Sequence, residues 1–164
     1  MDSTPTTSDE PTPATRSLTI RTLAREDWAL AFRHGDAFFA HRGLSGAYSM
    51  ERALRTWTLL SDVSVTTLLV GEREAGTIVG GIGMVIIQDE WAEWTYGSEG
   101  FFFLVEKTPG LAVSLMRAGE AWVHAQGVSD CRMAAYHQDD FPLVERFYRQ
   151  QGYRPYSTIF RREG

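Results

Sequence analysis

Residues 99–127, EGFFFLVEKTPGLAVSLMRAGEAWVHAQG, place a strand, a short loop and a helix in direct succession. Glu99–Val105 is apolar on both faces, as a central strand of a sheet is. From residue 110 the apolar residues recur at helical spacing as far as Gly127, which predicts an amphipathic helix with a glycine C-cap. The loop between them holds Lys107, the only lysine among the chain's 16 lysine and arginine residues.

This loop has the features of an anion site, because Gly110 introduces the helix. The first turn of a helix offers free backbone N–H groups and the positive end of the helix dipole. Lys107 adds a positive charge beside them, so the stretch predicts a phosphate-binding turn. The alternative interpretation is an ordinary strand-to-helix turn whose lysine is only solvated.

The residues before this stretch predict a tail, two helices and a hairpin. Residues 1–16 are rich in Ser, Thr and Pro, which is typical of a disordered tail. The other predicted elements are a strand at 17–23, a helix at 28–32 capped by Asp27, a helix at 49–60, a hairpin of strands 66–72 and 77–87, and a polar, aromatic loop at 88–98. The glycines at 80, 81 and 83 indicate a bulge or the close approach of another backbone.

After residue 127 the pattern continues with a strand at 131–136 and a helix that Asp140 caps and Gly152 ends. A last strand is expected at 156–160. This order predicts an α/β fold, with a mixed sheet flanked by helices in one domain over residues 17–164.

Composition and charge exclude several classes of protein. A hydrophobic content of 43% and a charged content of 23% are typical of a soluble globular protein. The sequence lacks a long apolar run and a secretion-signal layout, so we expect a cytoplasmic protein that does not insert in a membrane. A net charge of −5 disfavours nucleic acid as a partner. The single Cys131 is expected to be a buried apolar residue, and the four histidines show no metal-ligand spacing, so no metal is expected.

Four motifs in this order resemble those of the GNAT superfamily of acyl-CoA-dependent N-acetyltransferases. The resemblance extends over about residues 99–162 and is topological over 17–98. The motifs are Lys107-x-x-Gly110-x-Ala112, similar to the pyrophosphate loop Gln/Arg-x-x-Gly-x-Gly/Ala; Leu115–Trp122, similar to Leu-Leu-x-x-x-Glu-x-Trp; Val144-x-x-Phe147-Tyr148-x-x-x-Gly152-Tyr153, similar to the last-helix signature; and the closing stretch 154–160, similar to bacterial and phage-borne members.

The resemblance implies a GNAT fold and transfer of an acetyl group from acetyl-CoA to a primary amine of a small molecule or a protein. It places Tyr148 at the position of the general acid and Glu99 at that of the general base. Glu93 and His137 are rival bases. The acidic middle of the chain is compatible with a cationic amine, which Trp91 or Trp94 would contact through a cation–π interaction. Members of the superfamily also dimerise, so a homodimer is one option.

The resemblance also implies where acetyl-CoA would lie. Lys107 and the N–H groups of Gly110, Leu111, Ala112 and Val113 would hold the pyrophosphate. The pantetheine arm would lie along Leu104 and Val105, and an N–H between Phe103 and Val105 would polarise the thioester carbonyl. Pro109 departs from the pattern because it has no N–H. It favours the alternative of a GNAT-fold protein that binds acyl-CoA or a protein partner without catalysis.

Overall fold

The computed structural model describes residues 18–41, 48–74, 76–135 and 141–157. These residues form a five-stranded sheet with helices on both faces, so the predicted α/β class is confirmed. The expected tail at 1–16, the capping Asp140 and most of the expected last strand lie outside the described residues. Of that strand, Tyr156 and Ser157 are described and are not part of the sheet.

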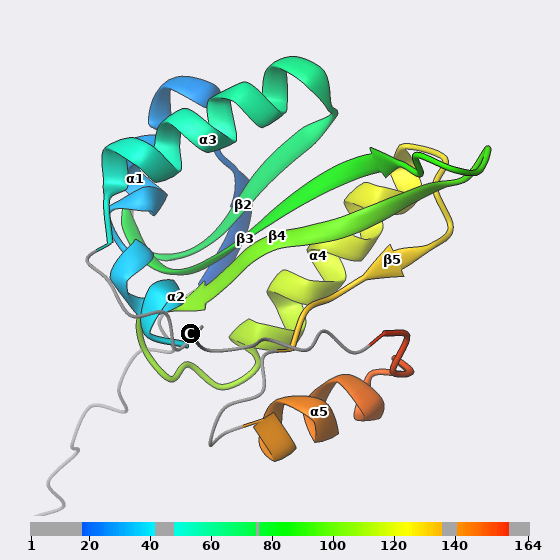
Figure 1. The fold of residues 1–164 in the computed structure, drawn as a ribbon. Helices are drawn as coiled ribbons and strands as arrows, with labels where there is room; N and C mark the ends of the chain where they lie inside the picture. Colours follow the sequence, from blue (N-terminus) through cyan, green and yellow to red (C-terminus); the bar gives the residue numbers. More distant parts are fainter. Residues whose placement is uncertain (1–17, 42–47, 75, 136–140, 158–164) are drawn as a thin grey trace, which may run out of the picture.

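The sheet follows the order of the sequence, with β1 (Leu18–Thr22), β2 (Thr66–Arg73), β3 (Thr77–Gln88), β4 (Thr95–Leu104) and β5 (Cys131–Arg132) side by side (Figure 1). The first four strands are antiparallel, whereas β5 is parallel to β4. A parallel neighbour needs a long crossover, which the helix after β4 provides.

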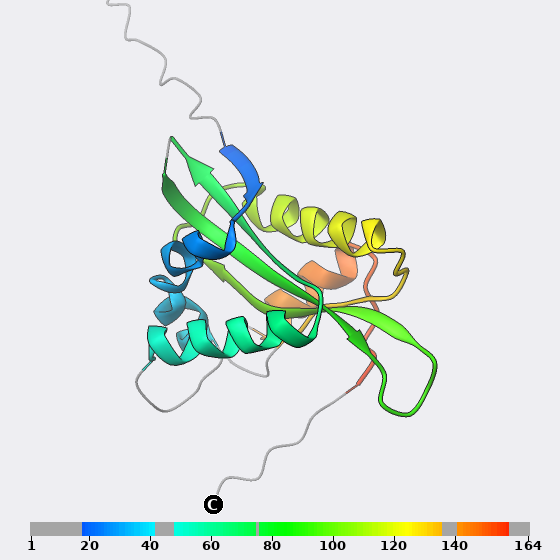
Figure 2. The ribbon, with the colours of Figure 1, turned by 90° about the horizontal axis from the view of Figure 1, so that it is seen from above.

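Helices cover both faces of the sheet. On one face lie a short 3₁₀ turn (Arg25–Asp27), α1 (Trp28–Phe32), α2 (Gly35–His41) and α3 (Met50–Val63). On the other lie α4 (Leu111–Ala125) and α5 (Phe141–Gln150) (Figure 2). Helix α2 was not predicted, and Asp27 makes no side-chain cap bond to α1. Ser49 does cap α3, because its hydroxyl accepts a hydrogen bond from the Arg52 N–H at 3.3 Å.

Each face of the sheet has its own apolar core. The core under α1–α3 is aromatic, with Trp57 packed against Phe101 and Phe32 at ring-centroid distances of 5.0 and 6.4 Å. The core under α4 is aliphatic, and Leu111, Leu115 and Val123 of the helix are fully buried in it. β4 contributes side chains to both cores, so the strand predicted after Glu99 is apolar on both faces, as expected.

Two glycines end the helices on the second face, as predicted. Gly127 (φ 79°) and Gly152 (φ 93°) both adopt the left-handed conformation that favours glycine. Two backbone hydrogen bonds close the last turn of each helix, as is typical of a glycine C-cap. After α4 the N–H groups of Val128 and Gly127 donate to the carbonyls of Val123 and His124, and after α5 those of Tyr153 and Gly152 donate to the carbonyls of Tyr148 and Arg149. The backbone of Tyr148 is therefore fixed by the end of its own helix.

The strands differ from the prediction in length. The loop expected at 88–98 is only a turn at 89–94, because residues 95–98 continue β4 and pair with residues 85–88 of β3. The strand expected at 131–136 is limited to Cys131 and Arg132. Residues 133–135 carry no regular structure, because β4 no longer pairs with the chain there.

A bulge interrupts the pairing of β3 with β4. Gly83 lies opposite Phe101 and Met84 opposite Glu99, so Gly100 is an extra residue on β4. Both features expected of the glycines at 80, 81 and 83 are present: the register shift lies at Gly83, and a Cβ atom at Gly80 would lie 3.0 Å from the backbone carbonyl oxygen of Phe103. At Gly81 and Gly83 a Cβ atom would meet the rings of Phe103 and Phe101.

Candidate active site

The candidate site lies where β4 and β5 separate. Among the described residues, β5 pairs with β4 only through Gly97–Cys131 and Ser98–Arg132. Beyond Ser98, β4 runs on to Leu104 with no strand from the described part of the chain on that side, and Figure 1 shows the chain after β5 leaving it. This exposes one edge of a central strand in the middle of the sheet.

Glu99 is the first residue of β4 beyond the paired region. Its Oε2 accepts a hydrogen bond from the Ala134 N–H at 3.4 Å, so the carboxylate takes the place of the next bond between the strands. The same oxygen accepts the hydroxyl proton of Tyr148 at 3.1 Å. The structure therefore brings together the two residues predicted as catalytic, which are 49 positions apart in the sequence.

Tyr148 reaches Glu99 from the last turn of α5. Its side chain is only 8% exposed and packs against Phe147 and Tyr153, at ring-centroid distances of 5.3 and 5.5 Å. A buried phenol requires a hydrogen-bond partner, and Glu99 provides one. The pair thus combines a proton acceptor with a proton donor at the point where the strands part.

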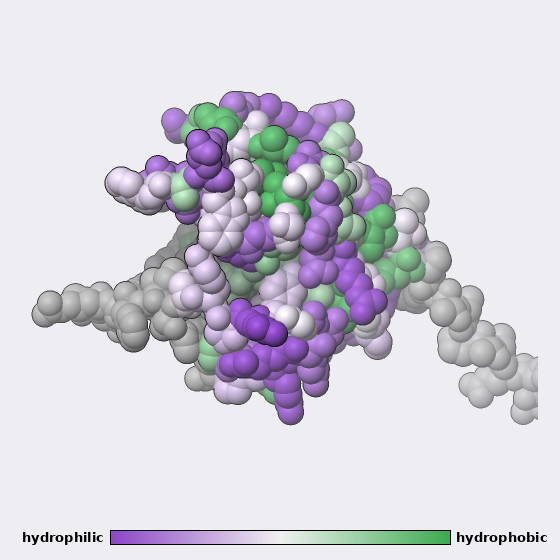
Figure 3. All heavy atoms as spheres, turned by 90° about the vertical axis from the view of Figure 1, so that its right-hand side faces the viewer, coloured by the Kyte–Doolittle hydropathy of each residue, from purple (hydrophilic) through white to green (hydrophobic). Residues whose placement is uncertain are grey.

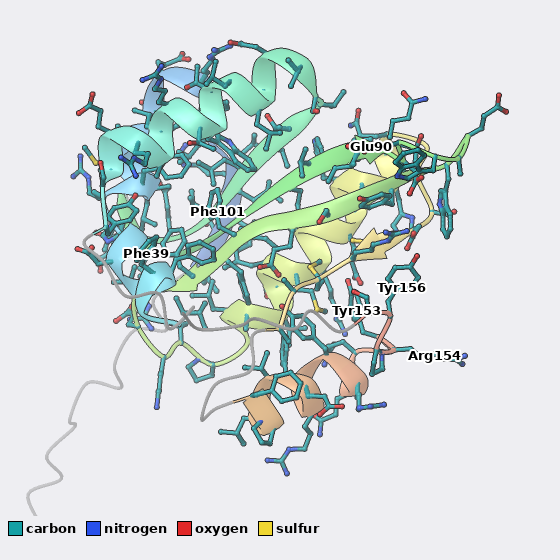
Figure 4. The ribbon with its side chains drawn as sticks, viewed as in Figure 1. Phe39, Glu90, Phe101, Tyr153, Arg154 and Tyr156 are labelled. Atoms are coloured by element: carbon teal, nitrogen blue, oxygen red, sulfur yellow. The ribbon has the colours of Figure 1, made fainter. Side chains whose placement is uncertain are left out.

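A second tyrosine–carboxylate pair lies nearby. Tyr153, between α5 and α4 in Figure 4, donates its hydroxyl proton to Oε1 of Glu120 at 2.6 Å. Burial, together with this hydrogen bond, raises the pKa of the Tyr153 phenol well above its ordinary value. Cys131, 3.9 Å from the same hydroxyl, is half-buried rather than fully buried as expected, and burial raises the pKa of its thiol from 9.0 to about 11.

The predicted phosphate loop connects β4 to α4. Gly110 precedes the helix at φ 78°, and Lys107 is exposed. The N–H of Leu111 donates to the Thr108 carbonyl at 3.2 Å, and the side chain of Leu111 is fully buried. Within the described part of the chain, no acceptor is found for the N–H groups of Gly110, Ala112 and Val113. These three donors remain for a phosphate at the start of α4.

The bulge at Gly100 decides which backbone groups of β4 face the open edge. The Val105 N–H donates to the Val79 carbonyl at 2.9 Å. Since hydrogen bonding alternates along an antiparallel strand, Phe103 also faces β3, opposite Gly81. The N–H groups predicted to meet the cofactor at Phe103 and Val105 are thus engaged in the sheet, whereas Phe102 and Leu104 turn their backbone toward the open edge. Phe102 was not predicted, because the sequence does not reveal the extra residue in β4.

The rival bases lie elsewhere. Glu93 is exposed in the turn between β3 and β4, and the part of β4 from Thr95 to Glu99 alone spans about 13 Å at about 3.3 Å per residue. His137 lies outside the described residues. Trp91 in the same turn is 93% exposed. The ring of Trp94 makes a cation–π contact within the chain, because Cζ of Arg132 lies 5.1 Å from its centroid.

Arg73 is a residue of this region that sequence reasoning missed. At the end of β2, its Nη1 lies 2.7 Å from Oε1 of Glu106, and its Nη2 donates to Oγ1 of Thr108 at 3.0 Å. The two partners are on either side of Lys107 in the phosphate loop. Nothing in the sequence pairs residues 35 positions apart, because the contact depends on the β2–β3–β4 register.

Other kinds of site receive no support from the described residues. They contain no group of three or more His, Cys, Asp or Glu side chains suited to holding a metal ion. No helix among them is long and apolar enough to span a membrane. Figure 3, which faces the end where the β3–β4 turn projects, shows hydrophilic and hydrophobic residues interspersed over this surface.

No protein-family model and no curated protein sequence matches the chain, but solved structures resemble its fold. A putative acetyltransferase from Pyrococcus furiosus matches with 16% identity and a TM-score of 0.68, over 90% of this chain and 99% of that one. A GCN5-related N-acetyltransferase from Ralstonia eutropha JMP134 matches with 22% identity and a TM-score of 0.67, over the same shares of the two chains.

A third structure is a predicted acetyltransferase from Clostridium acetobutylicum, solved with acetyl-CoA. It matches with 11% identity and a TM-score of 0.68, over 90% of this chain and 96% of that one. These likenesses cover 90% of this chain. The protein therefore has the fold of the GNAT (GCN5-related N-acetyltransferase) superfamily.

Proposed function

We propose that this protein is an N-acetyltransferase that moves an acetyl group from acetyl-CoA to a primary amine. The observation that carries the proposal is the hydrogen bond between Tyr148 and Glu99 at the point where β4 and β5 part. Acyl transfer to an amine needs a base that accepts a proton from the ammonium group and an acid that protonates the leaving thiolate. The pair contains one group of each kind.

The hydrogen bond also connects the two proton transfers. Glu99 accepts a proton from the amine, directly or through a water, and Tyr148 gives its proton to the thiolate of CoA. The proton on Glu99 then passes to the phenolate along the 3.1 Å contact, which restores both groups. An ammonium acceptor loses two protons when it is acylated and the thiolate takes up only one, so the second proton leaves to solvent in each turnover.

The residues around the pair suit acetyl-CoA as the acyl donor. The N–H groups of Gly110, Ala112 and Val113 are left for the pyrophosphate, with Lys107 as the neighbouring cation. The backbone of Phe102 and Leu104 is left for the pantetheine arm, as an added strand would use it. Pro109 removes none of these donors, so its lack of an N–H is compatible with binding.

The acceptor is proposed only as a class, a cationic amine. Asp89, Glu90 and Glu93 cluster in the β3–β4 turn and give this end of the molecule negative charge. Among the solved structures of this fold are aminoglycoside acetyltransferases, including AAC(6')-Ig from Acinetobacter haemolyticus at 11% identity. A panel of acceptors should therefore contain aminoglycosides, polyamines and peptides with free N-termini.

The first test is binding of acetyl-CoA, followed by thiol release with the amine panel. Binding at one hundred times the dissociation constant stabilises a fold by about 2.7 kcal/mol, which a thermal shift detects. Absence of a shift with both acetyl-CoA and CoA contradicts the proposal. Binding without thiol release from any amine favours the alternative of an acyl-CoA-binding protein that does not catalyse transfer.

The second test uses the two tyrosine–carboxylate pairs as matched variants. Glu99→Gln and Tyr148→Phe should each lower kcat about 10²- to 10⁴-fold, the usual range for loss of a general base or acid, and leave acetyl-CoA binding nearly unchanged. Glu120→Gln and Tyr153→Phe make the same changes in the other, half-buried pair and should affect stability far more than kcat. Equal losses of kcat in both pairs would assign a structural role to Glu99 and Tyr148.

A further inference from the structure

The phosphate loop is held to the sheet by a single side chain. In the part of the chain that the structure describes, every side-chain hydrogen bond or ion pair to residues 105–110 comes from Arg73. Its two contacts, 2.7 Å to Glu106 and 3.0 Å to Thr108, fall on either side of Lys107. The other bonds of the loop are local or belong to the end of the β-ladder.

Arg73 also balances a charge that opposes phosphate binding. Glu106 directly precedes Lys107 in the chain, so it adds a negative charge to the loop that would bind the pyrophosphate. An unpaired carboxylate in this loop would repel an anion, and the guanidinium of Arg73 weakens that repulsion. Arg73 is itself only 25% exposed, which keeps the pair partly shielded from solvent.

We infer that Arg73 is a positioning residue for acyl-CoA, which fixes the loop through Glu106 and Thr108 and cancels the charge of Glu106. The inference rests on the proposed function. A loop ordered before binding loses less conformational entropy when the ligand arrives, so the clamp favours affinity. Arg73 touches neither Glu99 nor Tyr148 in the structure and is not expected to change the chemical step.

The experiment measures the dissociation constant of acetyl-CoA by calorimetry for the full chain and six variants. Arg73→Ala should weaken binding about tenfold, and Thr108→Val, which removes only the hydroxyl contact, about two- to threefold. Glu106→Gln should bind at least as tightly as the unaltered protein. Combined with Arg73→Ala it should recover the part of the loss that is due to charge.

The matched control is Arg21→Ala, because Arg21 forms a comparable ion pair with Glu72, at 2.6 Å, on the neighbouring part of the sheet. It removes one positive charge and one cross-strand contact without touching the loop. In turnover, Arg73→Ala should raise KM for acetyl-CoA with kcat nearly unchanged, and Arg73→Lys should restore part of the affinity.

Three outcomes distinguish the possibilities. Failure of the unaltered protein to bind acetyl-CoA contradicts the proposed function itself. If it binds and Arg73→Ala binds equally well, or if Arg21→Ala weakens binding as much as Arg73→Ala, the inference about the clamp is wrong. Tenfold weakening by Arg73→Ala alone, with partial recovery through Glu106→Gln, supports it.

Discussion

Glu99 shows how a single residue can both end a strand pairing and begin a candidate site. Its carboxylate accepts a hydrogen bond from the Ala134 N–H, which would have bonded to the backbone of β4 if the strand pairing had continued. The same atom then fixes the phenol of Tyr148. A glutamine at this position would keep an acceptor for both donors but would lose the capacity to take up a proton, which is why Glu99→Gln is an informative variant.

Lys107 is the residue at which a functional role and simple solvation predict different results. Lys107→Ala should raise the dissociation constant of acetyl-CoA about fivefold at low salt, with less effect at high salt, because an exposed charge acts through a screened field. Its free energy of unfolding should change by less than about 0.5 kcal/mol. Calorimetry and urea denaturation measure the two quantities.

The control for Lys107 is Arg55→Ala, an exposed cation on α3 at the other face of the sheet. This variant has the same net charge as Lys107→Ala but leaves the loop intact. Similar affinities for the two variants, or a larger effect of Lys107→Ala on folding than on binding, would make Lys107 a merely solvated residue of the turn.

At the scale of elements, the bulge in β4 determines which edge the strand offers. The extra residue, Gly100, reverses the alternation of the strand, so Phe102 and Leu104 rather than Phe103 and Val105 face the unpaired side. Trp57 of α3 packs directly against this residue: a Cβ atom at Gly100 would lie 2.7 Å from its Cζ3 atom. The aromatic core under α1–α3 therefore supports the bulged part of β4.

Gly100→Ala tests this support. We expect a loss of about 1–3 kcal/mol in the free energy of unfolding, because the added methyl group meets a ring that is itself fixed in the core. Weaker acetyl-CoA binding should accompany it, since the bulge sets the strand edge. Urea denaturation and calorimetry measure both effects. Trp57→Phe in combination should lose less stability than the sum of the single variants; full additivity would exclude the Trp57 contact as the cause.

At the scale of the whole molecule, the helices of the second face are connected through half-buried polar groups. Tyr153 after α5, Glu120 on α4 and Cys131 on β5 meet in one cluster. Burial keeps the thiol and the phenol protonated in the folded state. The unfolded chain loses these protons at lower pH, so the stability of the whole fold is linked to alkaline pH.

We therefore expect the free energy of unfolding to fall as the pH rises above about 9. The pKa of Cys131 is raised from 9.0 to about 11, so the folded state binds more protons than the unfolded state in that interval. The stabilising contribution is complete below pH 9 and is lost toward pH 11. Guanidinium denaturation between pH 7 and 10.5 measures the change. The Cys131→Ala variant should lose less stability between about pH 8 and 10, and an identical pH dependence would contradict this linkage.

The predicted elements differ in how well local sequence specified them. The helix after Gly110 and its end at Gly127 were predicted because helical spacing and a glycine C-cap are local signals. The continuation of β4 back to Thr95 was missed, because pairing with β3 rather than local propensity places residues 95–98 in the sheet. The two-residue length of β5 was missed for the same reason.

The sequence by itself determined the fold class, the loop after the central strand and the choice of Glu99 and Tyr148 as candidates. Spacing, capping residues and apolar periodicity act over a few positions and are readable along the chain. The tertiary structure decided that Glu99 and Tyr148 meet, that Phe102 replaces Phe103 at the open edge, and that Arg73 holds the loop. These features depend on strand register and on contacts between residues 33 to 49 positions apart, which no local pattern specifies.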